Sequence, residues 1–337
     1  MTGIHARGAD ARFREFMMTE SNKDAVMRNL IAVAILAPLV ALAGCSDSTN
    51  FLGKKSKGIV YDGYLAGAKV CVDQIVNRQC DDPPEPATFT DADGGFRLTA
   101  LTPEQARYPL VAEVVPGTTI DLDTGLPAPA GLKYLAPAGS NSISAFSTIV
   151  QIRIEQEIVA GLNVVPIVVP DLVTLKKTVT EALTTELGLP ANIDLTDYDP
   201  IKVKNKGSAS AAARETAAKL HIVNQILTAQ IVEFLPLAVA NANPPSQESA
   251  AYPALIAKLD PAQVLAEVEA YIAANTLTLA DLLDPAFDPA IIPVTDPAVP
   301  TQAEIFIQFE NDVNIAQSID NLVNGGQAVT GGTGGTP

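Results

Sequence analysis

Residues able to carry out covalent or acid–base chemistry are few in this chain. Among 337 residues there are three cysteines, Cys45, Cys71 and Cys80, and two histidines, His5 and His221. Asp and Glu number 38 against 22 Lys and Arg, so the net charge is −16. A chain this acidic is not expected to bind nucleic acid, because proteins that do so present clustered Lys and Arg to the phosphates.

The sequence holds no recognisable catalytic motif. Gly-x-Ser-x-Gly, His-Glu-x-x-His, a phosphate-binding loop and a dinucleotide-binding fingerprint are all missing from it. His221 stands beside the apolar stripe of an Ala-rich segment, where a histidine is more often part of the core than catalytic. Paired carboxylates could hydrolyse glycosides, but aromatic residues able to stack on sugars make up only 5% of the chain. We therefore expect no enzyme and no catalytic residue, with an unrecognised hydrolase as the alternative.

One group of oxygen-bearing side chains is a weak candidate for a calcium site. Alternating carboxylates and amides suit Ca²⁺, which prefers oxygen ligands. Residues 74–76 are Gln-Ile-Val, however, where a calcium loop would have polar residues and glycine. The favoured interpretation is that these side chains cap their own backbone in turns, so no firm metal site and no cofactor are predicted. The weak candidates are Asp73, Asn77, Asp81, Asp91 and Asp93.

The surroundings of Cys45 indicate export. Met27-Arg28-Asn29 precedes an apolar run from Leu30 to Leu42, and small residues follow, as in a secretory signal. The run is shorter than the roughly 20 residues that a membrane-spanning helix needs. The closing residues Leu42-Ala43-Gly44-Cys45 resemble the lipobox of bacterial lipoproteins. An ordinary signal peptide, or a buried apolar helix, is the alternative.

The lipobox resemblance implies a lipid anchor on Cys45. Cleavage before this residue would remove residues 1–44, of which 27–44 are the signal proper. Diacylglycerol would join the Cys45 sulfur, and a fatty acid such as palmitate would acylate the new N-terminus. Ser46 implies sorting to the outer membrane, where we expect display at the cell surface rather than on the periplasmic face. Residues 1–44 hold five basic and four acidic groups, so the mature chain would carry −17.

Residues 45–57 read as a lipidated tether rich in Ser, Lys and Gly, and short strands follow it. The next 80 or so residues alternate in polarity and are divided by Asp-Gly and Pro-Gly turns, which is typical of a small antiparallel sandwich. The strands are expected at residues 58–61, 68–72, 87–90, 96–99 and 110–115.

Within this region the sequence resembles the carboxypeptidase regulatory-like, or prealbumin-like, β-sandwich domain. The resemblance is carried by Gly58 to Cys71, with its Gly67-Ala68 step, and by the later Thr90-Asp91-Ala92-Asp93-Gly94-Gly95-Phe96 hairpin. It implies a sandwich over residues 58–137, about a quarter of the chain. It implies no peptidase activity, because the domain accompanies enzymes and surface proteins without catalysing a reaction.

Cys71 and Cys80 are the two cysteines that remain after Cys45, with eight residues between them. In an exported protein such a pair is expected to form a disulfide. Free thiols are the alternative, and zinc would need further ligands that the neighbouring sequence does not offer.

From Asn141 onward the periodicity becomes helical, which predicts an all-α domain over residues 141–324 and an α+β, two-domain fold for the whole chain. A helix is expected to open at Ser142, with Ser142 or Ser144 as its N-cap. Residues 194–200 read as an acidic loop and 325–337 as a disordered Gly/Thr tail. Further helices are expected at 171–187, 208–242, 248–259, 261–275, 278–283 and 301–322, with a Pro-rich connector at 284–300.

These features favour a non-enzymatic, lipid-anchored envelope protein that acts as a binding or structural module at the cell surface. Its partners would be the membrane, through the lipid, and an unidentified protein or glycan. A periplasm-facing accessory subunit of an envelope complex is the alternative.

Overall fold

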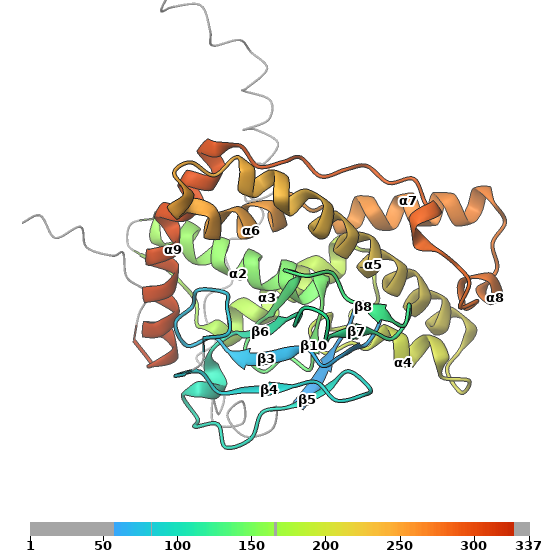
Figure 1. Ribbon diagram of the computed structural model, residues 1–337, viewed down its shortest axis with the longest axis horizontal. Helices are drawn as coiled ribbons and strands as arrows, with labels where there is room; N and C mark the ends of the chain where they lie inside the picture. The colour runs from blue at the N-terminus through green and yellow to red at the C-terminus, as the bar shows by residue number, and fades with distance from the viewer. Residues whose placement is uncertain (1–56, 82, 165–166, 327–337) are drawn as a thin grey trace, which may run out of the picture. The chain divides into compact units, whose positions relative to one another are not determined.

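The computed structural model describes residues 57–326, except residues 82 and 165–166. The predicted signal, Cys45, the tether up to residue 56 and the tail from residue 327 lie outside the described residues. Within the described residues the protein is mixed α+β, with helices layered on one side of a group of short strands (Figure 1).

The strands form three small sheets. A four-stranded antiparallel sheet has the order β4-β3-β6-β9, and a second sheet has the order β10-β1-β5, in which β1 and β10 run parallel. A third sheet has the order β2-β7-β8. All five predicted strand runs contain a strand. The strands are β1 (Lys57–Val60), β2 (Leu65–Ala66), β3 (Lys69–Val72), β4 (Ala87–Phe89), β5 (Gly95–Arg97), β6 (Leu110–Glu113), β7 (Ile120–Asp121), β8 (Leu126–Pro127), β9 (Lys133–Ala136) and β10 (Ser142–Ile143).

Thr90 joins the two sequence motifs of the strand region. Its hydroxyl accepts a hydrogen bond from the Ala68 amide at 2.8 Å and donates one to the Leu65 carbonyl at 2.6 Å. Gly67, between these two residues, has φ +77°, a conformation that side chains with a Cβ rarely adopt. The Gly-Ala step and the Thr-Asp hairpin are therefore held against each other by this buried side chain together with backbone hydrogen bonds between Thr90 and residues 67 and 68.

The helices agree closely with the periodicity of the sequence. Asp171 caps α3 by accepting the amides of Val173 and Thr174, and Ser210 caps α5. Thr301 and Glu304 form a capping box at the start of α9. The helices are α2 (Ala145–Leu162), α3 (Leu172–Glu186), α4 (Pro200–Asn205), α5 (Ala211–Ala240), α6 (Glu248–Ile256), α7 (Pro261–Ala274), α8 (Leu279–Leu282) and α9 (Gln302–Val323).

Two local features differ in part from the expectation. Of the two predicted N-caps Ser144 is confirmed, and α2 begins after it at Ala145, whereas Ser142 does not open the helix, because Ser142 and Ile143 form β10 beside β1. The predicted acidic loop ends in a helix that the sequence did not suggest, since the Asp199 carboxylate accepts the Lys202 amide and starts α4. In both places a contact between distant segments or a local cap decides the structure.

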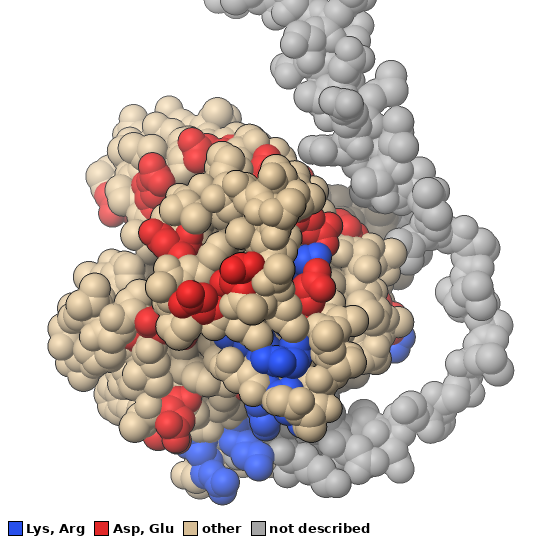
Figure 2. Space-filling view, turned by 90° about the vertical axis from the view of Figure 1, so that its right-hand side faces the viewer, with Lys and Arg blue, Asp and Glu red and all other residues tan. Residues whose placement is uncertain are grey.

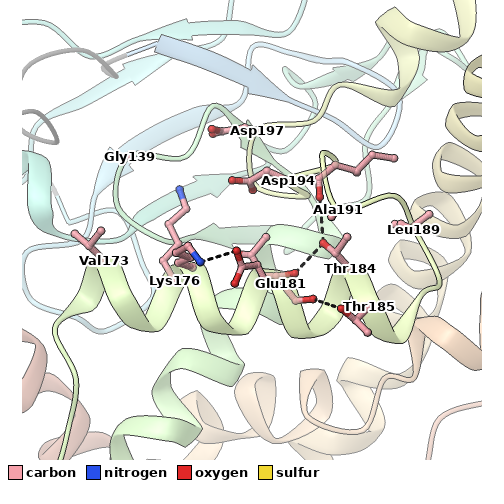
Figure 3. A pocket seen from close by; sticks show the side chains of 13 residues that line it. Gly139, Val173, Lys176, Glu181, Thr184, Thr185, Leu189, Ala191, Asp194 and Asp197 are labelled. Carbon is pink, nitrogen blue, oxygen red and sulfur yellow. Dashed lines mark hydrogen bonds and ion pairs between the residues drawn. The ribbon is translucent and has the colours of Figure 1, made fainter. Parts of the chain in front are cut away.

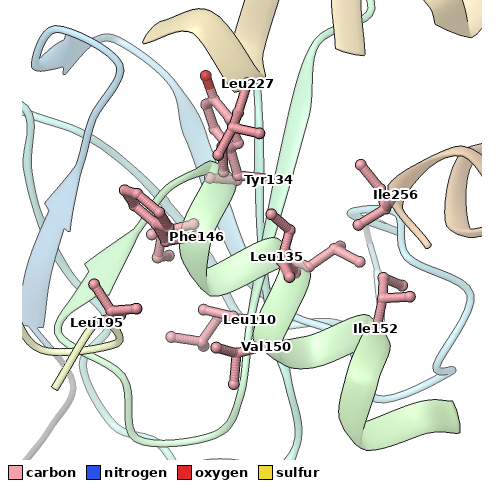
Figure 4. Packing of buried hydrophobic residues seen from close by; sticks show 14 of the residues in the cluster. Leu110, Tyr134, Leu135, Phe146, Val150, Ile152, Leu195, Leu227 and Ile256 are labelled. Carbon is pink, nitrogen blue, oxygen red and sulfur yellow. The ribbon is translucent and has the colours of Figure 1, made fainter. Parts of the chain in front are cut away.

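The hydrophobic core is continuous between strands and helices (Figure 4). Leu110 and Leu135 of the four-stranded sheet belong to the same buried cluster as Val150 of α2 and Leu227 of α5. The strands and helices thus bury one another. The division into a sandwich domain (58–137) and a helical domain (141–324) stays a prediction.

Among the described residues, α5 is long and apolar enough to cross a membrane by length and composition alone. Of its most apolar stretch, 56% is buried inside the protein. Leu220, Val223 and Leu227 on this helix are all buried in the core, so its hydropathy is accounted for by packing.

The predicted disulfide is present and closes a loop. Cys71 and Cys80 are bonded, with their Cα atoms 5.6 Å apart. Arg78 on this loop extends into the helical layer, where Nε and Nη2 donate to Glu155 Oε2 of α2 at 3.1 and 2.8 Å. Nη2 also donates to Asp312 Oδ1 of α9 at 2.8 Å. The Arg78 and Glu155 side chains are only 5% and 3% exposed, so each needs the other's charge.

Further polar contacts fix this buried pair. Lys133 Nζ on β9 donates to the Arg78 carbonyl at 2.8 Å and lies 4.9 Å from the ring centroid of Tyr252 on α6. Gln151 donates to the second oxygen of Glu155 at 3.0 Å. Burial, followed by the charge of the nearby Arg78, lowers the pKa of Lys133 to about 8. One polar network therefore joins the disulfide loop, the sheet and three helices.

We predict that Arg78→Met lowers the free energy of unfolding by about 3–5 kcal/mol, because it leaves the Glu155 carboxylate buried without its partner. Urea unfolding monitored by circular dichroism measures the change. As the matched control, Arg78→Met/Glu155→Gln should recover at least half of the loss. A single variant within about 1 kcal/mol of the natural protein would contradict the importance of the pair.

Candidate functional site

A cavity of the described structure lies beside α3. It has a volume of about 770 Å³ and is bounded by one face of α3 and by residues 189–197, with Gly139 at one end (Figure 3). We call it the α3 cavity. Its lining combines apolar side chains with hydroxyl and charged groups, and comprises Gly139, Val173, Lys176, Lys177, Thr180, Glu181, Thr184, Thr185, Leu189, Ala191, Ile193, Asp194 and Asp197.

Local sequence explains both walls of the α3 cavity. The α3 residues that line it recur every three or four positions, as one face of a helix must. Gly188, with φ +62°, ends the helix, and the Leu189 amide then bonds to the Thr184 carbonyl at 3.0 Å. Asp194 Oδ1 accepts hydrogen bonds from the amide and hydroxyl of Thr196, at 2.9 and 2.7 Å. The second wall is thus a hydrogen-bonded loop of defined shape.

Polar groups within the α3 cavity are mostly engaged by the protein. Lys176 Nζ donates to Ser140 Oγ at 3.1 Å, and Asp197 Oδ1 accepts the Asn141 amide at 3.1 Å. The Thr184 hydroxyl donates to the Thr180 carbonyl at 2.8 Å. The Thr180 hydroxyl differs, since this residue is only 4% exposed and Oγ1 has no hydrogen-bond partner among the described residues.

An unpaired buried hydroxyl is costly, by roughly 1–3 kcal/mol, unless something supplies a partner. Thr180 lies on the wall of a cavity whose volume falls in the range of about 300–1,000 Å³ typical of small-molecule sites. A molecule that brings a hydrogen-bond acceptor to this wall would satisfy the group. The arrangement can therefore bind and orient a small ligand.

His221 lies in a separate buried cluster. Its ring is 2% exposed, and Nε2 is 2.7 Å from the Asp62 carbonyl and 3.0 Å from Asp123 Oδ2. Nδ1 is 2.6 Å from Lys204 Nζ. With the Lys204 ammonium donating to Nδ1, the His221 ring carries its proton on Nε2. The ring thereby joins α5 to α4 and to the β7–β8 turn. None of its hydrogen-bond partners in the described structure is a serine or cysteine nucleophile.

The carboxylate partner of His221 is Asp123, which lies 98 positions earlier in the chain. No motif spacing in the sequence indicates this pairing. Burial also raises the pKa of the neighbouring Asp62 carboxyl well above its ordinary value. The expected structural role of the histidine is consistent with these contacts.

The first group of weak calcium candidates lies in the disulfide loop. Asp73 Oδ1 accepts the Asn77 amide at 3.0 Å, and its Oδ2 accepts the Arg78 amide at 2.8 Å. Asn77 Nδ2 donates to Asp81 Oδ2 at 2.6 Å. Val76 and Arg78 have φ of 57° and 62°, so these hydrogen bonds support a backbone conformation that is rarely adopted.

The second group of weak candidates lies in the hairpin after β4. Asp91 Oδ1 accepts the amides of Asp93 and Gly95 at 3.0 and 2.8 Å, which makes it a turn cap. Across the described residues, no three His, Cys, Asp or Glu side chains are grouped so that they could hold a metal ion. The oxygens of Asp73 and Asp91 thus serve their own backbone.

The fold and the site define an α+β protein with a small-molecule-sized cavity and a buried structural histidine. No protein-family model, curated protein or solved structure that was compared with the chain matches it. The resemblance of residues 58–137 to the prealbumin-like domain accordingly rests on the sequence motifs.

Asp73 provides a test of pH dependence. Burial raises the pKa of its carboxyl to about 7, against about 3.9 in an unfolded chain. Between these values the folded state binds the proton more tightly, so this group lowers stability as pH rises from about 4 to about 7. We predict that Asp73→Asn removes this dependence, and that its stability relative to the natural protein improves by up to about 4 kcal/mol between pH 4 and pH 8.

Urea unfolding at several pH values measures the effect, with the exposed Asp93→Asn as the matched control. A constant difference between Asp73→Asn and the natural protein at every pH would contradict the titration. Repeating the series with millimolar CaCl₂ tests the weak calcium candidates, because a bound ion would stabilise only the protein that retains Asp73.

Proposed function

We propose that this chain is a non-enzymatic, lipid-anchored protein of the bacterial cell envelope that binds a small ligand in the α3 cavity at the cell surface. The observation that carries the binding role is the cavity itself, about 770 Å³ in volume, with the unpartnered Thr180 hydroxyl on its wall. Size and a mixture of apolar and convergent polar groups are what small-molecule sites share.

The anchor is supported by the sequence. Leu42-Ala43-Gly44-Cys45 follows a basic start and a short apolar run, and Ser46 favours the outer membrane. Each buried CH₂ of an acyl chain contributes about 0.8 kcal/mol, and a single chain is marginal, so the multiple acyl chains of a lipoprotein hold firmly.

The proposed architecture is a prealbumin-like sandwich over residues 58–137, followed by a helical domain over 141–324. The strands found at all five predicted runs support it, as does the contact of Thr90 with the Gly67-Ala68 step. The sandwich supplies the disulfide loop and its Arg78, and the helical part supplies both walls of the α3 cavity apart from Gly139.

The binding role predicts that filling the α3 cavity abolishes ligand stabilisation. Ala191 lines the cavity and is exposed, so Ala191→Trp adds bulk there without disturbing the core. The probe is the small-molecule fraction, below about 1 kDa, of a cell-envelope extract. A ligand at about 100 times its Kd stabilises its protein by about 2.7 kcal/mol, which thermal melting detects.

The natural protein and the control Ala286→Trp, altered at an exposed connector residue, should both melt at higher temperature in this fraction, whereas Ala191→Trp should not. Equal shifts in all three proteins would place any binding elsewhere. No shift in the natural protein would count against the α3 cavity as a ligand site.

Surface display is tested by protease treatment of intact cells beside a lysed control, with detection of the helical region. We predict digestion on intact cells, and we predict that Cys45→Ala leaves the protein soluble and without palmitate. Protection until lysis would instead support the periplasm-facing accessory subunit. Membrane retention of the Cys45→Ala protein would contradict the anchor.

A further inference from the structure

A second hollow lies where the strands meet α4. It has a volume of about 710 Å³ and shares Asp197 with the α3 cavity. Three basic residues line it, Lys57 on β1, Arg97 on β5 and Lys202 on α4, and all three are exposed. We call this hollow the basic groove.

Three acidic residues, Asp91, Asp197 and Asp199, also line the basic groove and equal the basic ones in number, but their carboxylates are engaged in hydrogen bonds within the protein. Both oxygens of Asp199 lie 2.9 Å from the Tyr64 hydroxyl, and Oδ1 accepts the Lys202 amide at 2.8 Å. Asp91 caps its own turn, and Asp197 accepts the Asn141 amide. By contrast, the side chains of Arg97 and Lys202 make no ion pair within the described part of the chain.

Basic residues gather at this end of an otherwise acidic protein. Lys202, Lys204 and Lys206 follow one another through and just beyond α4, although the chain carries a net charge of −16. Figure 2 shows most of the Lys and Arg side chains of one face collected in its lower part, with Asp and Glu mainly above them and an acidic group also beside them. Such separation of charge orients a molecule in the field of an anionic surface.

An exposed aromatic side chain stands in the same groove. Phe89 on β4 lines the basic groove and is 60% exposed, the highest value for any described phenylalanine. An apolar ring flanked by Lys and Arg is the combination that peripheral membrane proteins place at the headgroup level. Exposure of this apolar ring to water is unfavourable in itself.

The start of the described chain keeps this groove close to the anchor. Only 11 residues separate Cys45 from Lys57, and Lys54 and Lys55 are among them. A fully extended chain spans at most about 3.3–3.6 Å per residue, so Lys57 stays within roughly 40 Å of a lipidated Cys45. This short reach gives the groove a high effective concentration at the bilayer.

We propose that the basic groove docks onto the anionic, phosphate-bearing surface of the bilayer that holds the lipid anchor. The inference rests on the proposed anchor and adds a defined orientation to it, with Lys57, Arg97, Lys202 and Phe89 facing the headgroups. Each basic residue near an anionic membrane strengthens association about fivefold, the equivalent of about 1 kcal/mol.

The sequence contains no tryptophan, so Phe89→Trp introduces a single tryptophan at the basic groove, and its fluorescence reports on this position alone. The full-length acylated protein is reconstituted into phosphatidylcholine vesicles with or without about a third phosphatidylglycerol, at low salt. We expect the tryptophan fluorescence emission to shift to the blue, and to be quenched by brominated lipid, only in the anionic vesicles. Both effects should be reversed at high salt, because ions screen the attraction.

Two charge variants in the Phe89→Trp background sharpen the test. Arg97→Gln/Lys202→Gln should lower the ratio of docked to undocked protein about 25-fold, since two fivefold contributions are lost. Lys219→Gln/Lys258→Gln removes the same net charge at two lysines that line neither the basic groove nor the α3 cavity, and should have little effect. Arg97→Lys/Lys202→Arg keeps both charges and should dock normally.

Equal tryptophan emission in neutral and anionic vesicles would overturn the docking. An equal loss of docked protein in both Gln variants would overturn it too. Release by inorganic phosphate at constant ionic strength would also overturn it and indicate a soluble phosphate site. Intact mass reports acylation separately. An acylated protein that fails to dock overturns only this inference, whereas an unacylated protein overturns the proposed anchor together with it.

Discussion

The buried ion pair between Arg78 and Glu155 is the constraint on which the arrangement of strands and helices depends. Neither side chain reaches water to any useful extent, so separating them would leave two uncompensated charges in the interior. Arg78 belongs to the disulfide loop and Glu155 to α2, while Asp312 brings α9 to the same guanidinium. The position of the helices over the sheet is therefore specified by electrostatics as well as by the shared apolar core.

Elements with strong local signals could be predicted from the sequence. Helical periodicity placed α3, α5 and α9 to within a few residues, and the structure shows that Asp171, Ser210 and Thr301 cap these helices. Strands of only two residues, such as β7 and β8, carry too little pattern to be recognised. At Ser142 the helical pattern was overridden, because its backbone pairs with β1 and bonds to the Thr196 carbonyl.

The sites were less predictable, because they are built from residues far apart in the chain. The predicted export signal and the two remaining cysteines were enough to predict the disulfide. The partner of His221 comes from a turn 98 residues away, and the α3 cavity needs both a helix face and the loop after it. The one available signal was the run of threonines on α3, at 180, 184 and 185, which is unusually polar for a packed helix.

The distance along the chain between Arg78 and Asp312, 234 residues, also governs how the molecule can assemble. A polypeptide emerges with its N-terminus first, so Arg78 and Glu155 are present long before α9 exists. Until that last helix arrives, apolar surface that α9 will cover on α2 and α6 stays open, along with one side of the guanidinium. A chain interrupted before residue 302 would therefore leave this apolar surface exposed and prone to aggregation.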